Sequence, residues 1–351
     1  MNNIKRMLAL LMSLAFISSS ITVNASESGN STTETQIQHH TPVILDVDMA
    51  TDVDDVTAIK IATELSVEGT IDLKGVAFSV NPGNGKEVLA MEGALDSAGL
   101  YDVPIGKAST GHYDTSPYYD ALISYKKVDH TVYANAVDMY KNILSIIPDG
   151  QKARIVTTGF LFNIQSLLQD KEGYKLVKEK VDGIYIAGGE YSGLCWNLSY
   201  QPDVIAATSY VTENCPVNIY FAMDVLGANR CGGSLTMMDK DNTDFLSKCF
   251  SSFGLKDGDT YGNCDGTAVY CCAMQNFAYN GFYKAVPCSF HIDEKSGIIN
   301  QAVTTKNTNT YMLETTLVKD KYALYNSKIY TDLMDSIINA SYIRKVQYGS
   351  F

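Results

Sequence analysis

Apolar residues recur along this chain with two alternating periods. Short apolar runs predict buried strands, and the segments between them carry apolar residues at the three-to-four-residue spacing of amphipathic helices. The first pair is a strand over Val43–Val47 followed by a helix through Val56, Ile59, Ala62 and Leu65. The same pattern predicts strands over Leu73–Val80, Val103–Gly106, Arg154–Thr157, Gly183–Ala187 and Val217–Ala222, and helices over Val88–Leu95, Val132–Ile147 and from about Asn163 onward.

Strands that alternate with helices in this way are typical of βαβ units. We therefore expect an α/β fold with a Rossmann-like, mostly parallel sheet and helices on both of its faces. A Cys- and Gly-rich stretch at 227–280 has no clear period, and there we expect helices and loops that cover the carboxyl edge of the sheet. Because no linker-like composition interrupts residues 42–351, this segment is expected to form a single domain.

The N-terminal segment has a different character. Two basic residues precede an apolar run from Met7 to Ile17, and a small-residue cleavage site ends at Ala25, as in a secretory signal peptide. The run is too short for a comfortable membrane span, although an uncleaved N-terminal anchor is the alternative. We expect residues 1–25 to be removed, no membrane partner, and a secreted, extracellular protein. Residues 26–41 are polar without an apolar period, which predicts a disordered lead-in.

The composition of the chain indicates which classes of binding partner it suits. Hydrophobic residues make up 46% of the 351 residues, which is enough for a core, and 27 basic against 39 acidic residues give a net charge of −12. Such a chain has no electrostatic footprint for nucleic acid, whereas clustered acids suit a metal cation. All eight cysteines lie from Cys195 onward, and an oxidising compartment permits up to four disulfides among them.

The segment VILDVDMATDVDDVTAI carries the most informative chemistry. It places Asp46, Asp48, Asp52, Asp54 and Asp55 between the first strand and the first helix, at the sheet edge where α/β proteins bind ligands. Aspartates also cap helix N-termini and complement the helix dipole, but that accounts for one or two of the five. Clustered carboxylates repel one another unless a cation neutralises them, and hard oxygen ligands favour calcium or magnesium. The segment therefore predicts a metal site.

Two common aspartate motifs do not fit this segment. An EF-hand loop that began at Asp46 would need glycine at its sixth position and glutamate at its twelfth, where this chain has Thr51 and Thr57. The aspartyl-phosphatase motif of the haloacid dehalogenase type, D-x-D-x-[TV], would place Ala50 at its last position. That motif also leaves the aspartates after Thr51 unexplained.

A strand followed by D-x-D, a short turn and D-D-x-x-A-[IL] resembles the calcium-dependent nucleoside hydrolases. Their usual form has three residues between the two aspartate pairs, whereas this chain has five, from Met49 to Val53, as in a divergent branch. Three later segments resemble the same superfamily in the same order. They are IVTTGFLFNI at 155–164, IYIAGGEYSGLCWNLSYQPDVIAA at 184–207 and CDGTAV at 264–269.

The resemblance to these inosine- and uridine-preferring enzymes implies an activity and a metal. It implies a Ca²⁺-dependent N-ribohydrolase that cleaves the N-glycosidic bond of ribonucleosides to free base and ribose. Calcium would be held by Asp48, Asp55, the backbone carbonyl of Thr158 and Asp265, and Asp48 would take the proton of a calcium-bound water. The partner is then a small-molecule ribonucleoside, and a homo-oligomer is compatible with the resemblance.

The resemblance also implies a set of substrate contacts. Asp54 would bond the ribose hydroxyls, and Asn197 would bond the sugar. The candidates for stacking on the base are Trp196, Tyr191 and Tyr261. One further sugar-binding asparagine is Asn81 or Asn84; the spacing does not decide between them, and we prefer Asn81. The remaining aspartates of the cluster, Asp46 and Asp52, are expected to be structural and to bond loop amides.

Two positions depart from the resemblance. Cys195 stands where the superfamily has a glutamate before its aromatic–Asn pair, and Cys264 stands where a histidine often precedes the last calcium aspartate. That histidine helps to protonate the leaving base in some members. The alternative is therefore a secreted calcium-binding protein of the same fold that binds a sugar or nucleoside with little or no turnover.

Overall fold

The computed structural model describes residues 40–49, 52–81, 85–108, 116–223, 230–233, 244–274, 283–315, 328–342 and 344. The expected signal peptide, most of the expected lead-in and the alternative sugar ligand Asn84 lie outside the described residues.

A central sheet runs through the molecule, with the strand order β4-β3-β2-β1-β5-β6-β8-β13-β11-β12-β7 among the described residues. Every neighbouring pair from β4 to β13 is parallel, so the predicted mostly parallel sheet is confirmed. The bounds of these strands are β1 (Thr41–Val47), β2 (Ile71–Phe78), β3 (Ile105–Gly106), β4 (Val132–Tyr133), β5 (Ala153–Thr157), β6 (Val181–Ala187), β8 (Asn218–Ala222) and β13 (Thr310–Thr315).

The far end of the sheet is antiparallel, which the sequence did not predict. There β11 (Tyr283–Ile292) pairs with β13 and with β12 (Ile299–Val303), and β12 pairs with the two-residue β7 (Ser192–Gly193). Because β7 lies in the loop that follows β6, this pairing ties the C-terminal strands to a loop at the carboxyl edge.

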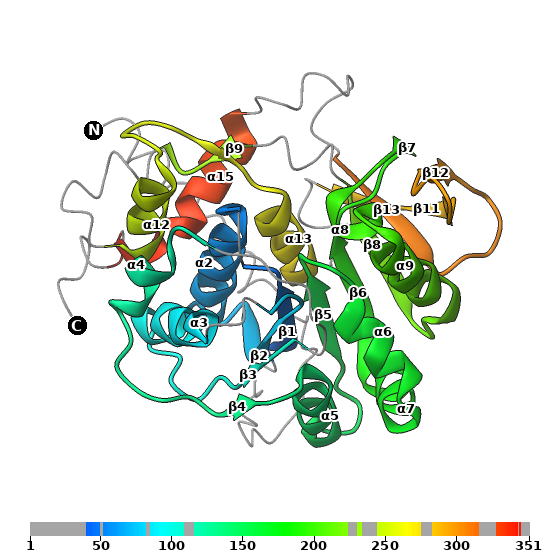
Figure 1. Ribbon diagram of the computed structural model, residues 1–351, viewed down its shortest axis with the longest axis horizontal. Coiled ribbons are helices and arrows are strands. Elements are labelled where there is room, and N and C mark those ends of the chain that lie inside the picture. The colour runs from blue at the N-terminus through cyan, green and yellow to red at the C-terminus, as the bar shows by residue number, and fades with distance from the viewer. Residues whose placement is uncertain are drawn as a thin grey trace, which may run out of the picture.

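Helices cover both faces of the sheet, as predicted (Figure 1). The faces are set by alternation along β1, where Val43, Leu45 and Val47 belong to one buried cluster and Ile44 to the other. The first cluster includes α2 (Asp54–Val67), α3 (Lys86–Ser97), α4 (Tyr119–Ile123), α12 (Phe245–Phe253), α13 (Cys264–Ala273) and α15 (Lys328–Ile338). The second includes α5 (Ala136–Ile146), α6 (Phe162–Gln169), α7 (Lys171–Lys180) and α9 (Pro202–Asn214).

The long helix predicted over Val132–Ile147 is shorter in the structure. Val132 lies in β4, and α5 begins at Ala136 because the side chain of Asn135 accepts a 2.8 Å hydrogen bond from the amide of Val137. This cap satisfies an amide that has no partner within the helix and so fixes where the helix starts.

Strand register brings several loop residues to one edge. Val47 pairs with Phe78, and Asp46 pairs with Thr157. The next residues along the three strands, Asp48, Ser79 and Thr158, therefore leave the sheet side by side at its carboxyl edge.

The stretch at 227–280 contains both helices and strands in its described parts. Besides α12 and α13, β9 (Arg230–Cys231) and β10 (Tyr261–Gly262) form a separate two-stranded antiparallel sheet. All eight cysteines are described, and all are free thiols, seven of them buried. Among the described helices, none has the length and apolar character needed to cross a membrane.

Candidate functional site

Three aspartates from distant parts of the chain meet at the carboxyl edge of the sheet. Asp48 follows β1, Asp55 lies in the first turn of α2, and Asp265 lies in the first turn of α13. One carboxylate oxygen from each lies within 4.8 Å of the others, and this is the one such group of potential metal ligands among the described residues. The structure thus brings together the three side chains that the sequence predicted as calcium ligands.

Two adjacent tyrosines hold the loop that carries these aspartates. Tyr118 donates a 2.6 Å hydrogen bond to the carbonyl of Asp52, and Tyr119 donates a 2.5 Å bond to the carbonyl of Met49. The carboxylate of Asp52 accepts from the amide of Val53 at 2.7 Å, as expected for a structural aspartate that bonds a loop amide. Both ends of the turn between β1 and α2 are thereby fixed.

Asp46 is fully buried beneath the cluster and has different partners from those expected. Its Oδ2 accepts from the hydroxyl of Tyr140 at 2.8 Å and from Nδ2 of Asn163 at 3.0 Å, so it bonds side chains of α5 and α6 and no loop amide. Burial raises the pKa of Asp46 to about 6, although these two hydrogen bonds oppose the rise. The carboxylate joins β1 to two helices on one face of the sheet.

Thr158 links the cluster to the predicted sugar ligand. Its hydroxyl donates to Oδ1 of Asp55 at 3.3 Å, and its carbonyl accepts a 2.6 Å hydrogen bond from Nδ2 of Asn197. The same Nδ2 reaches the carbonyl of Ala187 at 3.3 Å. The side-chain NH₂ group of Asn197 therefore donates to carbonyls at the ends of β5 and β6. Its Oδ1 is the atom that would face a ligand.

Close packing of α13 on α2 delivers Asp265 to the site. Gly266 makes this approach possible, because a Cβ atom there would lie 2.7 Å from Cδ1 of Ile61 on α2. The amide of Cys264 donates to Oδ2 of Asp54 at 3.2 Å, which places a carboxylate at the positive end of α13. Asp54, predicted as a ribose ligand, thus also positions the helix that carries Asp265.

The aspartates of the cluster have raised pKa values because they are buried close to one another. Burial raises the pKa of Asp48 to about 7, and the charges of Asp46 and Asp52 add to the rise. Burial and the charges of Asp52 and Asp48 likewise raise the pKa of Asp54 to about 7. The pKa values of Asp55 and Asp265 also rise, for the same two reasons.

These residues fit a calcium ion. Calcium binds oxygen ligands at 2.3–2.6 Å, so two oxygens on opposite sides of one ion lie about 4.6–5.2 Å apart. The oxygens of Asp48, Asp55 and Asp265 lie within 4.8 Å of one another, so all three can reach one ion, and all three are hard ligands of the kind that calcium takes. The buried hydroxyl of Ser79 is packed beside Asp48 at Gly159 and has no hydrogen-bond partner, so the site also retains an unused polar group.

The other predicted substrate contacts lie on the surface of the same edge. Trp196, the first residue of α8 (Trp196–Ser199), is 56% exposed, and its ring lies 3.7 Å from the ring of Tyr200, centroid to centroid. Asn81 is exposed just beyond the end of β2. The structure therefore leaves both side chains accessible to a ligand.

Sequence reasoning missed several residues that shape the site. Asn163 and Gly159 both stand within the quoted segment 155–164, which could have indicated them. No sequence pattern indicated a role for Tyr118 and Tyr119, because their partners are backbone carbonyls more than sixty residues away in the chain.

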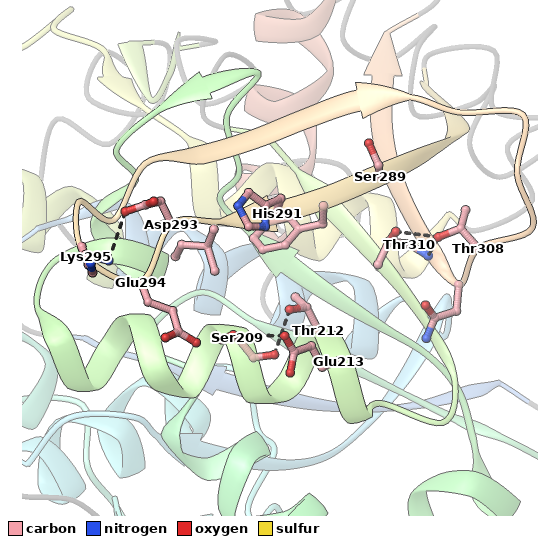
Figure 2. A pocket seen from close by; sticks show the side chains of 13 residues that line it. Ser209, Thr212, Glu213, Ser289, His291, Asp293, Glu294, Lys295, Thr308 and Thr310 are labelled. Carbon is pink, nitrogen blue, oxygen red and sulfur yellow. Dashed lines mark hydrogen bonds between the residues drawn. The ribbon is translucent and has the colours of Figure 1, made fainter.

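A hollow with a volume of about 630 Å³ lies elsewhere, between α9 and the β11–β12 hairpin (Figure 2). Its lining residues include Glu213, His291 and Glu294, whose side chains are exposed. Solvated groups of this kind lack the convergent buried carboxylates of the Asp48 site. The candidate functional site is therefore the aspartate-lined edge.

Comparison with known proteins supports the fold. No protein-family model and no curated protein matches the chain. Among solved structures, the inosine-uridine preferring nucleoside hydrolase from Bacillus anthracis has a TM-score of 0.61 at 13% identity, covering 83% of this chain and 99% of its own. An inosine-guanosine nucleoside hydrolase gives 0.58 at 15% identity, covering 84% and 99%. The type III effector protein XopQ, complexed with adenosine diphosphate ribose, gives 0.60 at 15% identity, covering 87% and 94%.

The α/β architecture and these neighbours define the class to which the structure belongs. The chain has the nucleoside hydrolase fold, and the fold predicted from the sequence is confirmed.

Proposed function

We propose that this chain is a divergent nucleoside hydrolase, a secreted Ca²⁺-dependent enzyme that hydrolyses ribonucleosides to free base and ribose. The observation that carries the proposal is the triad of Asp48, Asp55 and Asp265 at the carboxyl edge of a nucleoside hydrolase fold. These three residues and the carbonyl of Thr158 would hold the ion. Bound calcium would supply the positive charge that fixes the ribose hydroxyls and polarises the attacking water.

Asp48 is the proposed general base. It takes one proton from water as the water oxygen bonds to C1′ of the ribose and the C1′–N bond breaks. The electron pair of that bond leaves with the base, which takes up one proton from solvent. The sugar becomes oxocarbenium-like on the way, and the surrounding carboxylates stabilise its positive charge. Asp54, Asn81 and Oδ1 of Asn197 would hold the ribose, which favours ribosides over deoxyribosides. Trp196 would face the base.

A specific observation favours the alternative of a binding protein with little turnover. The described histidines are His40, His130 and His291, and none of them lies at the carboxyl edge. His40 precedes β1, and His130 is buried against Asp96. His291 lines the hollow between α9 and the β11–β12 hairpin. Among the described residues, no histidine therefore stands at this edge to protonate the leaving base.

A panel assay separates the two candidates. The protein lacking residues 1–25 is incubated with ribosides in calcium or in EDTA, and released ribose is measured as reducing sugar. We expect calcium-dependent release that Asp48→Asn abolishes and that Glu213→Gln, a change in an exposed acid outside the site, leaves intact. Calcium-dependent binding of a riboside without ribose release would establish the alternative, and release insensitive to Asp48→Asn would place the chemistry elsewhere.

Export is tested separately. We expect the protein recovered from culture medium to begin at Ser26, which N-terminal mass spectrometry measures. A product that stays with the cells and begins at Met1 would contradict export.

A further inference from the structure

Three aromatic side chains, Phe160, Tyr200 and Trp196, pack in a row next to the aspartate cluster. We call this row the aromatic step. Phe160 is buried, and Tyr200 stacks on it at 9° with the ring centroids 6.2 Å apart. Trp196 in turn packs on Tyr200 with the centroids 3.7 Å apart. Trp196 and Tyr200 are nevertheless 56% and 50% exposed. Two large aromatic side chains thus remain open to solvent although the buried ring of Phe160 supports them.

This aromatic step is joined to the site through the backbone. Phe160 follows Gly159, which packs against Asp48, and Trp196 precedes Asn197, whose side chain bonds the carbonyl of Thr158. A sugar held at the triad would therefore place its attached base toward Trp196. The position of the step beside the triad, and its exposure, mark it as the surface for the leaving group.

The electrostatic potential around the aromatic step is negative. The charged groups that act most strongly on Asp48, Asp55 and Asp265 are other carboxylates. None of the ion pairs formed among the described residues includes an aspartate of the cluster. A cationic ligand gains from such a field and from the electron-rich face of an indole ring. A neutral base also stacks on an indole ring but gains little from the field.

We propose that the preferred substrates are N-ribosides whose leaving group is a cation, such as pyridinium ribosides, bound on Trp196 with Tyr200 as its positioning residue. This inference rests on the proposed function. The chemistry balances without a general acid. Water supplies the hydroxyl group at C1′ and one proton to Asp48, and the pyridinium accepts the electron pair of the breaking bond and leaves as a neutral base.

The chain offers a direct probe, because Trp196 is its single tryptophan. Intrinsic tryptophan fluorescence therefore reports on this ring alone. We expect nicotinamide riboside to quench the fluorescence with saturation in calcium, and inosine to quench it weakly. Asp265→Asn should remove the saturable part. Quenching that rises linearly for both ribosides, as in random collision, would overturn the inference.

Kinetics test the same preference. We expect kcat/KM for nicotinamide riboside to exceed that for inosine by at least about 10-fold. Tyr200→Leu should reduce this ratio by about 3- to 30-fold, the range of a cation–π contact, while Tyr200→Phe should preserve it. Tyr174→Leu, a change in an exposed tyrosine on α7, is the matched control and should leave the ratio unchanged.

The outcomes distinguish the inference from the proposed function. Faster hydrolysis of inosine than of nicotinamide riboside would overturn the inference and leave the proposed function standing. Absence of ribose release from both would overturn the proposed function. In that case saturable quenching by nicotinamide riboside alone would still support the cationic class, as the ligand of a binding protein.

Discussion

Gly159 packs directly against the side chain of Asp48. A Cβ atom at Gly159 would lie 2.7 Å from Cβ and 2.8 Å from Cγ of Asp48, and 2.1 Å from Oγ of Ser79. All three distances are shorter than van der Waals contact, so any side chain at residue 159 must displace the carboxylate. The glycine after Thr158 is therefore part of what holds the metal ligand in place.

Gly159→Ala should lower calcium affinity by about 10- to 100-fold, the usual cost of disturbing a residue that orients a metal ligand. Isothermal calorimetry measures the affinity. Gly193→Ala is a matched control, because the nearest atoms to its Cβ, in Glu190, are 3.7 Å away and make ordinary contacts. Equal affinity in the wild type and Gly159→Ala would show that Asp48 is not a ligand.

Calcium should stabilise the folded protein by mass action. At a calcium concentration of 100 times Kd the gain is about 2.7 kcal/mol, which for a domain of this size corresponds to about 4 °C in Tm. EDTA should lower the Tm of the wild type by that amount. The Tm of Asp265→Asn should be the same with calcium and with EDTA. Differential scanning fluorimetry with and without EDTA makes the measurement, and a melt indifferent to EDTA contradicts the metal site.

Without calcium, stability should fall as pH rises. The pKa of Asp48 is about 7 in the fold and about 3.9 in an unfolded chain, so the folded state favours the protonated form. The associated stability is fully present below about pH 4 and is lost as pH rises through about 7. The Tm in EDTA should therefore decline over this range less steeply in Asp48→Asn than in the wild type. Parallel curves for the two proteins would refute this origin of the pH dependence.

Cys264→His should add a general acid at the mouth of the site. Residue 264 is partly exposed, and its amide bonds Asp54, so an imidazole there lies beside the proposed ribose position. A well-placed general acid accelerates a reaction by about 10²–10⁴-fold, and we expect a gain of about 10-fold for inosine from this unoptimised one. Nicotinamide riboside, which needs no proton on its leaving group, should gain nothing. A similar gain for both ribosides would point to a change in binding.

A buried pair of hydrogen-bonded side chains stabilises the fold away from the site. Asp96 bonds Nε2 of His130 at 3.0 Å and the amide of Val128 at 2.9 Å. Burial alone would raise the pKa of Asp96, but the amides of Lys127 and Val128, together with His130, hold it below its usual value. The stability that Asp96 contributes is therefore present above about pH 4 and is lost as pH falls through its lowered pKa.

Asp96→Ala should cost about 3–5 kcal/mol of unfolding free energy, because it leaves a buried histidine and two amides without their partner. Urea denaturation measures the cost. Asp102→Ala, which changes an exposed acid nearby, should cost less than about 0.5 kcal/mol. Ribose release at 25 °C should be the same for wild type and folded Asp96→Ala, and a selective loss of activity would tie this pair to the site.

Local sequence determined the layered fold and the position of the candidate metal site. Strand and helix periods reflect neighbours within a few residues, so β1, α2, β2 and β5 could be predicted near their observed bounds. Oxygen ligands crowded after a strand in turn indicate a cation. The helix predicted from Val132 failed at its start because apolar spacing does not register a cap such as Asn135.

Tertiary packing decided what surrounds each of these residues. Asp265 reaches Asp55 because Gly266 lets α13 approach α2, and Asp46 has Tyr140 and Asn163 as partners because α5 and α6 cover that face of β1. The pairing of β12 with β7 likewise joins the C-terminal strands to a loop far earlier in the chain. These contacts join residues about a hundred or more positions apart, and the energy of a contact depends on distance in space, which no local pattern of residue types encodes.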